Sequence, residues 1–369
     1  MTNETDQNSV NKNWLDKAVE PRSGEELPVA SLQECLLTNL PGTSGILRVH
    51  QFPGGFSNLT YQITLGVNTY VLRRPPFGAK IKSGHDMARE FRILSCLKTH
   101  YHKVPTPLYF TEDTSIIGAP FYIMERIEGV ILRAGMPKEM YPDAQKMRAI
   151  SEAWLETLVE LHAVDPSVEG IAELGRPEGY IERQILGWGK RYELSKTNEL
   201  PKVDFVIKWL AANQPKEQHT AIIHNDFKYD NLILKPENWE EVSAVLDWEM
   251  ATVGDPLMDL GTSLGYWINP NDIDTMRDFQ FSPSFLPGNL TREEIVHQYT
   301  LKTGRAIDSP VFYYVYGLLK IAVIVQQIYY RYQLGLTKDE RFGRLLNVID
   351  QISVVASRAI ERKKIDNLF

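Results

Sequence analysis

The 369-residue sequence has little cysteine and no surplus of positive charge. Its two cysteines, Cys35 and Cys96, are too few for a disulfide framework and have no metal-ligand spacing, which fits a reducing cytoplasm. Lys and Arg total 40 against 47 Asp and Glu, and the isoelectric point is near 5.7. Because nucleic-acid binders carry a basic footprint, nucleic acid is not an expected partner.

Signals for a membrane are also missing. Residues 1–17 are polar and acidic, without the apolar core of a signal peptide, and no uninterrupted apolar run is long enough to span a bilayer. We therefore expect a soluble, cytoplasmic protein with no membrane partner. A chain of this length with 43% hydrophobic residues can bury one large core or two lobes that share a cleft.

The most informative segment is residues 221–249, in which polar residues lie between short apolar runs. The apolar runs at residues 221–223, 232–234 and 244–246 predict short buried strands that hold the loops between them. Phosphoryl transfer needs a carboxylate that accepts a proton from the attacking hydroxyl, and oxygen ligands for magnesium. Asp226, Asn231 and Asp247 can supply these groups. Each alone is weak evidence, since Asp and Asn are common in turns.

The order of these residues resembles the aminoglycoside phosphotransferase and choline kinase superfamily, whose catalytic loop reads His-x-Asp-x-x-x-x-Asn and is followed by a strand that ends in Asp. The superfamily is related to the protein kinases. The resemblance implies that Asp226 is the base, and that Asn231 and Asp247 ligate the Mg²⁺ that accompanies ATP or GTP.

The same resemblance gives roles to other residues of the loop. His224 would fix the loop by packing and hydrogen bonding, and Lys228 would neutralise the transferred phosphoryl group. Many family members lack a lysine at this position, and they often have glycine where this chain has Asn225.

A glycine pair upstream predicts a tight turn between extended runs. Without side chains, Gly54 and Gly55 let the backbone approach phosphates. The run Gly-Gly-Phe-Ser-Asn resembles the family's phosphate loop, which implies that Gly54, Gly55, Ser57 and Asn58 bind the nucleotide. A plain hairpin turn is the alternative for the glycine pair alone.

Further nucleotide contacts follow from the resemblance. Arg73, at the end of a predicted strand, takes the place of the lysine that pairs with phosphates in protein kinases, and Glu90 on the next helix would pair with Arg73. The main chain around Glu125 to Ile127 would form the hinge that meets the adenine edge. A solvent-facing strand end and a solvated glutamate are the alternatives for Arg73 and Glu90.

Residues 254–260 match the family's Gly-Asp-Pro-x-x-Asp-Leu pattern. Asp255 before Pro256 predicts a helix N-cap with proline at the first helical position. Asp259 resembles the residue that braces the catalytic loop from below.

The predicted fold is α+β and resembles the bilobal protein-kinase fold, with a small antiparallel sheet and a helix in the first lobe and a mainly helical second lobe. A helix is expected to begin near Ser31, with that side chain as its cap. Strands are expected at residues 49–52, 60–65, 69–73, 108–111 and 121–126, and helices at residues 83–97, 143–163, 203–213, 292–303, 310–334 and 338–362. The expected domains are a polar extension (1–30), the smaller lobe (31–126) and the larger lobe (127–369).

The acceptor is predicted less sharply, because the fold does not fix it. Five aromatic residues in the larger lobe either line an acceptor pocket or belong to the core, and Arg183 and Arg191 could bind an anionic substrate. These aromatic residues are Tyr180, Trp188, Tyr192, Tyr266 and Trp267. Residues 179–192 mix acidic and basic side chains, whereas a polycationic aminoglycoside calls for an acidic pocket.

Three phrases, at residues 54–61, 70–76 and 88–92, look most like the phosphotransferase-like domain of acyl-CoA dehydrogenase family members 10 and 11 and its free-standing bacterial relatives. That resemblance implies a magnesium-dependent kinase that acts on the hydroxyl of a small molecule, such as a hydroxy acid or a hydroxyacyl-CoA. The alternatives are an aminoglycoside or amino-alcohol kinase and a catalytically silent nucleotide-binding protein. A protein kinase is disfavoured, because residues 248–253 leave no room for a long activation segment.

Overall fold

The computed structural model describes residue 15 and residues 17–53, 58–77, 86–133, 135–216, 219–274, 276, 283–336 and 340–369. The chain divides into two units. Unit 1 comprises Met1–Ile131 and Leu232–Ala251, and unit 2 comprises Leu132–Asn231 and Thr252–Phe369. The boundaries expected at residues 30 and 126 stay predictions, because a division by contacts does not test which segments fold independently.

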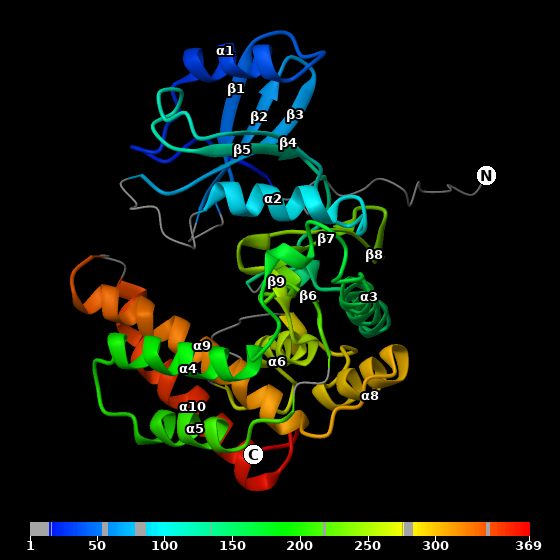
Figure 1. The fold of residues 1–369 in the computed structure, drawn as a ribbon, viewed down its shortest axis with the longest axis vertical. Coiled ribbons are helices and arrows are strands. Elements are labelled where there is room, and N and C mark those ends of the chain that lie inside the picture. The colour runs from blue at the N-terminus through cyan, green and yellow to red at the C-terminus, as the bar shows by residue number, and fades with distance from the viewer. Residues whose placement is uncertain are drawn as a thin grey trace. The chain divides into compact units, whose positions relative to one another are not determined.

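Unit 1 is built on an antiparallel sheet with the strand order β1-β2-β3-β5-β4 (Figure 1). Its strands are β1 (Leu47–Gln51), β2 (Leu59–Leu65), β3 (Asn68–Arg74), β4 (Pro107–Thr111) and β5 (Phe121–Glu125). A tight turn joins β2 to β3, where Gly66 has φ +63°, a conformation that favours glycine. Every second residue of β2 is buried, as its apolar alternation requires.

Helices α1 and α2 and a hairpin also belong to the described part of unit 1. Helix α1 (Val29–Asn39) packs Leu32 and Leu36 into a core with Tyr61 and Ile63 of β2. Helix α2 (Met87–Leu97) is capped by Asp86, which accepts from the amide of Arg89. The hairpin consists of β7 (Leu232–Lys235) and β8 (Asn238–Val245) and is followed by the 3₁₀ turn η5 (Trp248–Met250).

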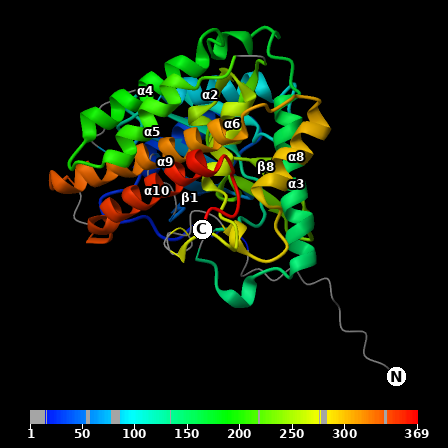
Figure 2. The ribbon, with the colours of Figure 1, turned by 90° about the horizontal axis from the view of Figure 1, so that it is seen from below.

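Unit 2 is mainly helical. A short antiparallel pair, β6 (Ala221–Ile223) with β9 (Thr252–Gly254), carries the loops of interest. Four helices run side by side in both views (Figures 1 and 2): α4 (Tyr180–Ser195), α5 (Pro201–Ala212), α9 (Pro310–Gln333) and α10 (Leu345–Arg362). Further helices among the described residues are α3 (Ala144–His162), α6 (Pro256–Tyr266) and α8 (Arg292–Thr303), and α3 contacts α8.

The 3₁₀ turns of unit 2 are short. They are η2 (Lys138–Met140), η3 (Ala172–Leu174), η4 (Tyr229–Asn231), η6 (Pro283–Phe285) and η7 (Glu340–Arg344). Turn η7 lies directly before α10, so the helix predicted from residue 338 begins later, at Leu345.

The predicted α+β class is confirmed, and most predicted strands and helices agree with the structure to within three residues. The strand predicted at residues 244–246 is the end of the longer β8, and the helix predicted from residue 83 is α2 from Met87, with residues 83–85 outside the described residues. The predicted cap of the first helix is wrong. Helix α1 begins at Val29, and the Ser31 hydroxyl donates instead to the carbonyl of Ile116 at 2.7 Å. Helix α4 is absent from the prediction, because its glycines and mixed charges weaken its apolar pattern.

Of the described helices, α9 alone is long and apolar enough to cross a membrane by length and composition. In the structure, 78% of its most apolar stretch is buried. Such burial is typical of a core helix, and it follows from the helices α4, α5, α6 and α10 that pack around α9.

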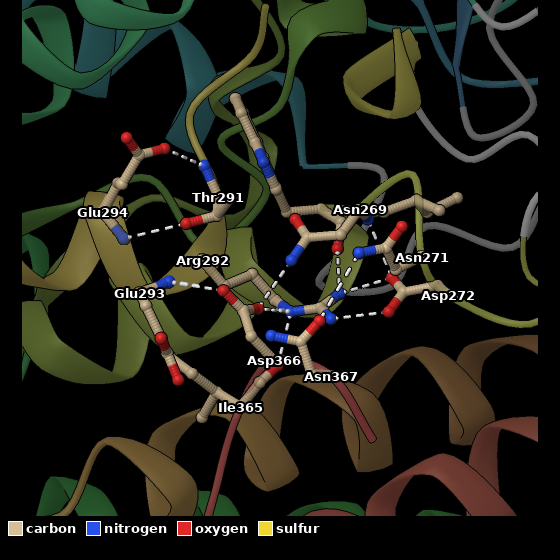
Figure 3. Close-up of polar contacts among 12 residues, drawn as sticks. Asn269, Asn271, Asp272, Thr291, Arg292, Glu293, Glu294, Ile365, Asp366 and Asn367 are labelled. Carbon is tan, nitrogen blue, oxygen red and sulfur yellow. Dashed lines mark hydrogen bonds and ion pairs between the residues drawn. The ribbon is translucent and has the colours of Figure 1, made fainter. Parts of the chain in front are cut away.

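A buried ionic cluster holds the C-terminal segment (Figure 3). The Arg292 guanidinium, at the start of α8, donates two bonds of 2.6 Å to the two oxygens of Asp272. Its Nε donates to the Ile365 carbonyl at 2.7 Å and to Asp366 at 3.0 Å. Because Arg292 is fully buried, the two carboxylates compensate a charge that would otherwise be costly.

We predict that Arg292→Met lowers the free energy of unfolding by about 3–5 kcal/mol, because it leaves two buried carboxylates without their cation. Chemical denaturation measures this change. Arg148 is a suitable control, since it pairs with Glu152 and Glu294 but is only partly buried. Arg148→Met should cost less than about 1 kcal/mol, and equal losses at the two positions would contradict the account.

Candidate active site

The catalytic loop of unit 2 connects β6 to η4. The main chain of this loop is fixed by Asp259 of α6, whose carboxylate oxygens accept from the amides of His224 and Asn225, both at 2.7 Å. The expectation that Asp259 braces the loop is thus confirmed. Helix α6 begins with Asp255 as its N-cap and Pro256 at the first position, also as predicted.

Asp259 is completely buried, and its carboxylate also forms a hydrogen bond with Nε2 of His162 at 3.2 Å. Burial by itself raises the pKa of Asp259, but the hydrogen bonds and charge of His162 and the amide of His224 outweigh it and hold the pKa below its usual range. Burial lowers the pKa of His162, against the effect of Asp259. The brace therefore stays an ionised carboxylate at neutral pH.

His224 and Asn225 take the shape that the loop requires. His224 is buried, and its Nδ1 accepts from the amide of Asp226 at 3.2 Å, so its predicted fixing role is confirmed. Asn225 has φ +66°. This left-handed conformation favours glycine and is tolerated by Asn, which explains why Asn can stand where relatives often have Gly.

The carboxylate of Asp226 is oriented by three neighbours. Lys228 Nζ lies 3.1 and 2.9 Å from its two oxygens, and Asn231 Nδ2 donates to Oδ2 at 3.0 Å and to the Asp226 carbonyl at 2.8 Å. The Tyr266 hydroxyl hydrogen-bonds to the same carboxylate. A carboxylate held in this way can accept a proton from a hydroxyl that approaches it.

Lys228 is a cation beside the proposed base. Burial lowers the pKa of Lys228, but Asp226 and Tyr266 outweigh it, so the net shift is upward. Its ammonium nitrogen lies 4.6 Å from the centre of the Tyr266 ring. Lys228 therefore stays charged and could meet a phosphoryl group.

Asp230 is a loop residue that the motif does not single out. Burial raises the pKa of Asp230 to about 6, although Lys228 and Arg133 oppose the shift. The pKa of this carboxyl is therefore closer to neutral pH than that of an ordinary aspartate.

The five aromatic residues considered for an acceptor pocket are all buried. Trp267 packs 4.7 Å from Trp154 and 5.2 Å from Tyr229, and its indole nitrogen donates to the Leu290 carbonyl. It belongs to the core. Tyr266 differs because it reaches the Asp226 carboxylate. Arg191 stacks over Trp188 at 4.4 Å, whereas Arg183 bonds to the main chain before α4.

Unit 1 carries the second group of predicted residues, around Arg73. The expected Arg73–Glu90 ion pair is present at 3.0 Å. The same guanidinium also contacts Asp247 at 2.7 Å and Glu249 at 3.3 Å. Burial alone would lower the pKa of Arg73, but the charges of Asp247 and Glu90 outweigh burial, so the pKa of Arg73 is raised. For Glu90 the net shift is also upward, because burial raises its pKa more than the charge of Arg73 lowers it.

Glu249 and Arg89 are unit 1 residues to which the sequence analysis gave no role. Glu249 Oε2 accepts from Asn58 Nδ2 at 2.8 Å, so it connects the end of the predicted phosphate loop to Arg73. Arg89 of α2 donates to the carbonyls of Glu249 and Ala251 at 2.8 and 2.5 Å. The one sequence signal for a role of Glu249 was its acidic side chain two positions after Asp247.

The remaining nucleotide-binding predictions are not tested by the structure. Gly54, Gly55 and Ser57 lie outside the described residues. Glu125 ends β5, and its amide donates to the Thr106 carbonyl at 2.8 Å. The amide of Glu125 is therefore already paired within unit 1.

Asn231 and Asp247 fit the ligands of magnesium chemically. Both offer hard oxygen donors, and Asn231 turns its amide nitrogen to Asp226, so its oxygen is the atom that could bind a metal. In unit 1, Asp247 lies in a cluster with Glu90 and Glu249 around Arg73, and its carboxylate is a hard oxygen donor. The described residues contain no group of three His, Cys, Asp or Glu for a metal. Such a group is not required here, because magnesium that is bound to a nucleotide is usually held by only one or two carboxylates together with the phosphates.

Solved structures define the class as the protein-kinase-like fold of the aminoglycoside phosphotransferases. A Ralstonia eutropha crystal structure, provisionally described as an aminoglycoside phosphotransferase, superposes with a TM-score of 0.75 at 29% identity and covers 90% of this chain and 99% of its own. An APH(2″) enzyme bound to GDP and kanamycin is similar in fold, with a TM-score of 0.59 and 18% identity over 88% of this chain and 98% of its own.

The chain belongs to the phosphotransferase enzyme family, APH, whose family model matches residues 48–293. The matched family is one of phosphotransferases. Mouse acyl-CoA dehydrogenase family member 10 is 37% identical over 81% of this chain, and chicken family member 11 is 31% identical over 94%. The chain spans 28% and 45% of the lengths of these two relatives.

We predict that Asp259→Asn loosens the catalytic loop, because the NH₂ group that replaces one carboxylate oxygen is a donor and would face a main-chain amide that is also a donor. The loss should be about 1–3 kcal/mol in the free energy of unfolding, measured by denaturation, together with a fall in turnover. Asp255→Asn is the control, since Asn also caps helices well. If both variants behaved alike, the loop-bracing role of Asp259 would be refuted.

Proposed function

We propose that this protein is a magnesium-dependent kinase that transfers the terminal phosphoryl group of ATP or GTP to a hydroxyl of a small acid or of its coenzyme A thioester. The observation that carries the proposal is the Asp226 carboxylate, which Lys228 and Asn231 hold at 2.9 and 3.0 Å in a braced loop. Such a group can orient the attacking hydroxyl and accept its proton.

In the proposed mechanism, the acceptor hydroxyl donates a hydrogen bond to Asp226 and attacks the terminal phosphorus in line. The oxygen–phosphorus bond to the acceptor forms, the bond to the leaving nucleoside diphosphate breaks, and the hydroxyl proton passes to Asp226. Lys228 offsets charge on the transferred group. Magnesium, when bound through Asn231 and Asp247, would neutralise the nucleotide phosphates.

The nucleotide is proposed to bind through unit 1. Arg73, held by Glu90, offers a planar donor to phosphates, and Asn58 ends the predicted phosphate loop. The roles of Gly54, Gly55, Ser57, Glu125 and Ile127 are part of this proposal and rest on the family resemblance.

The proposed acceptor class rests on two observations. The relatives at 31–37% identity are named as acyl-CoA dehydrogenase family members. Helix α4 carries Arg183, Lys190 and Arg191 against Glu182 and Glu193, so it does not offer the acidic surface that a polycationic aminoglycoside needs.

The first test follows phosphate transfer from labelled ATP or GTP to a panel of hydroxy acids, hydroxyacyl-CoA thioesters, aminoglycosides and choline-like amines. We expect transfer to the acids or thioesters, and Asp226→Asn should lower it by about a hundredfold or more with unchanged nucleotide affinity. Asp165→Asn, at an exposed turn, is the control. Transfer to aminoglycosides would refute the acceptor class, and full turnover by Asp226→Asn would refute the base.

A second prediction concerns Asp247. Asp247→Ala should weaken nucleotide binding in the presence of magnesium, because a phosphate-bridging metal loses a protein ligand. Calorimetric titration with ATP, in magnesium and in EDTA, separates the two cases. We expect the variant and the wild type to bind ATP with equal affinity in EDTA. If the variant lost the same affinity in both buffers, Asp247 would act by holding Arg73 and not by binding a metal.

A further inference from the structure

Lys320 is a charged residue in the middle of the apolar helix α9. It is 1% exposed, and its neighbours Leu318, Leu319 and Ile321 are buried as well. A buried ammonium group is costly unless it is paired or hydrogen-bonded. Its presence in the core therefore calls for an explanation from its contacts.

Close packing of two helices brings Lys320 to the catalytic loop. Gly261 and Gly265 of α6 meet Gly317 of α9, and a methyl group at any of the three would clash with the other helix's backbone. Lys320 lies three residues after Gly317, on the next turn. Helix α6 also carries Asp259, so the same glycine contact places both helices against the loop.

The contacts of Lys320 converge on Asn225, the residue before the proposed base. Its ammonium group donates to the Asn225 carbonyl at 2.5 Å and lies 3.4 Å from the side-chain oxygen. The Tyr180 hydroxyl of α4 donates to that side-chain oxygen at 3.2 Å. Together with the amide bond to Asp259, these contacts hold the left-handed conformation of Asn225 from three sides.

The charge of Lys320 is sustained by the loop. Burial lowers the pKa of Lys320 to about 8, while the carboxylates of Asp226 and Asp259 favour the charged form. The Trp188 ring, 5.6 Å away, adds a cation–π contact. A charged donor makes a stronger hydrogen bond to a carbonyl than a neutral one.

We propose that Lys320 is a positioning residue for phosphoryl transfer: through Asn225 it fixes the main chain that presents Asp226. The predicted effect on turnover rests on the proposed function. The fixing of the loop by Lys320 is a structural statement and is independent of that function. A residue that served stability alone would affect unfolding without changing the loop or the chemical step.

Lys320→Met tests the proposal, because it keeps the length and apolar stem of the side chain. The matched control is Gln326→Met, on the same helix. Gln326 is 1% exposed and donates to the Ser195 carbonyl at 2.7 Å, away from the catalytic loop. Both variants remove one buried polar group of α9, so they should lose similar stability.

Two readouts are measured on each folded variant. The first is amide hydrogen exchange of peptides that cover residues 224–231, and the second is turnover with the acceptor found by the panel, alongside nucleotide affinity. We expect Lys320→Met to speed exchange in the loop by about tenfold or more. Its turnover should fall by about tenfold to a hundredfold, with nucleotide affinity unchanged. Gln326→Met should show neither effect.

Loop exchange and turnover of Lys320→Met that match those of Gln326→Met would overturn the proposal. Should Lys320→Met not fold, Tyr180→Phe removes the second donor to Asn225, and unchanged loop exchange in that variant would count against the proposed network. If the wild type transfers no phosphate, the proposed function fails, whereas hydrogen exchange still decides whether Lys320 fixes the loop.

Discussion

The carboxylate of Asp259 is the interaction on which the larger unit depends. It binds two successive main-chain amides of the catalytic loop at 2.7 Å each, and it stays ionised because His162 and those amides offset its burial. A loop of polar residues has no regular hydrogen-bonding partners of its own. Asp259 supplies them from the first turn of α6, and the glycine contact between α6 and α9 fixes that helix in turn.

Charge balance imposes a second constraint, in unit 1. Arg73 is a single buried cation that contacts three carboxylates, of Glu90, Asp247 and Glu249. The carboxylate of Glu90 is buried, whereas those of Asp247 and Glu249 are partly exposed. A planar guanidinium has several donors and can contact three carboxylates at once, which a compact ammonium group does less readily.

The sequence points to those candidate site residues that phosphoryl-transfer chemistry demands at fixed spacing. Asp226 and Asp247 stand out because each follows a short apolar strand, and Asn231 because it directly precedes one. Asp255 stands out because Pro256 marks a helix start, whereas Asp259 was assigned from the family resemblance. The predicted ion pair of Arg73 with Glu90 relied on a known family arrangement, and the structure contains it.

Other contacts could not be predicted, because they join distant segments without a motif. Lys320 lies in an apolar helix, where periodicity indicates only a core position, and its partner Asn225 is 95 residues away. Tyr266 and Trp267 are adjacent aromatic residues with the same propensities, yet one reaches Asp226 and the other packs in the core. Helix packing, and not local sequence, makes that distinction.

The most direct test of the account is a crystal structure with magnesium, a non-hydrolysable ATP analogue and an accepted hydroxyl substrate. The account predicts that the acceptor oxygen lies about 2.6–3.2 Å from an Asp226 oxygen, with magnesium bound to Asn231 and Asp247. An acceptor oxygen directed at another residue, or a metal that neither side chain touches, would contradict it.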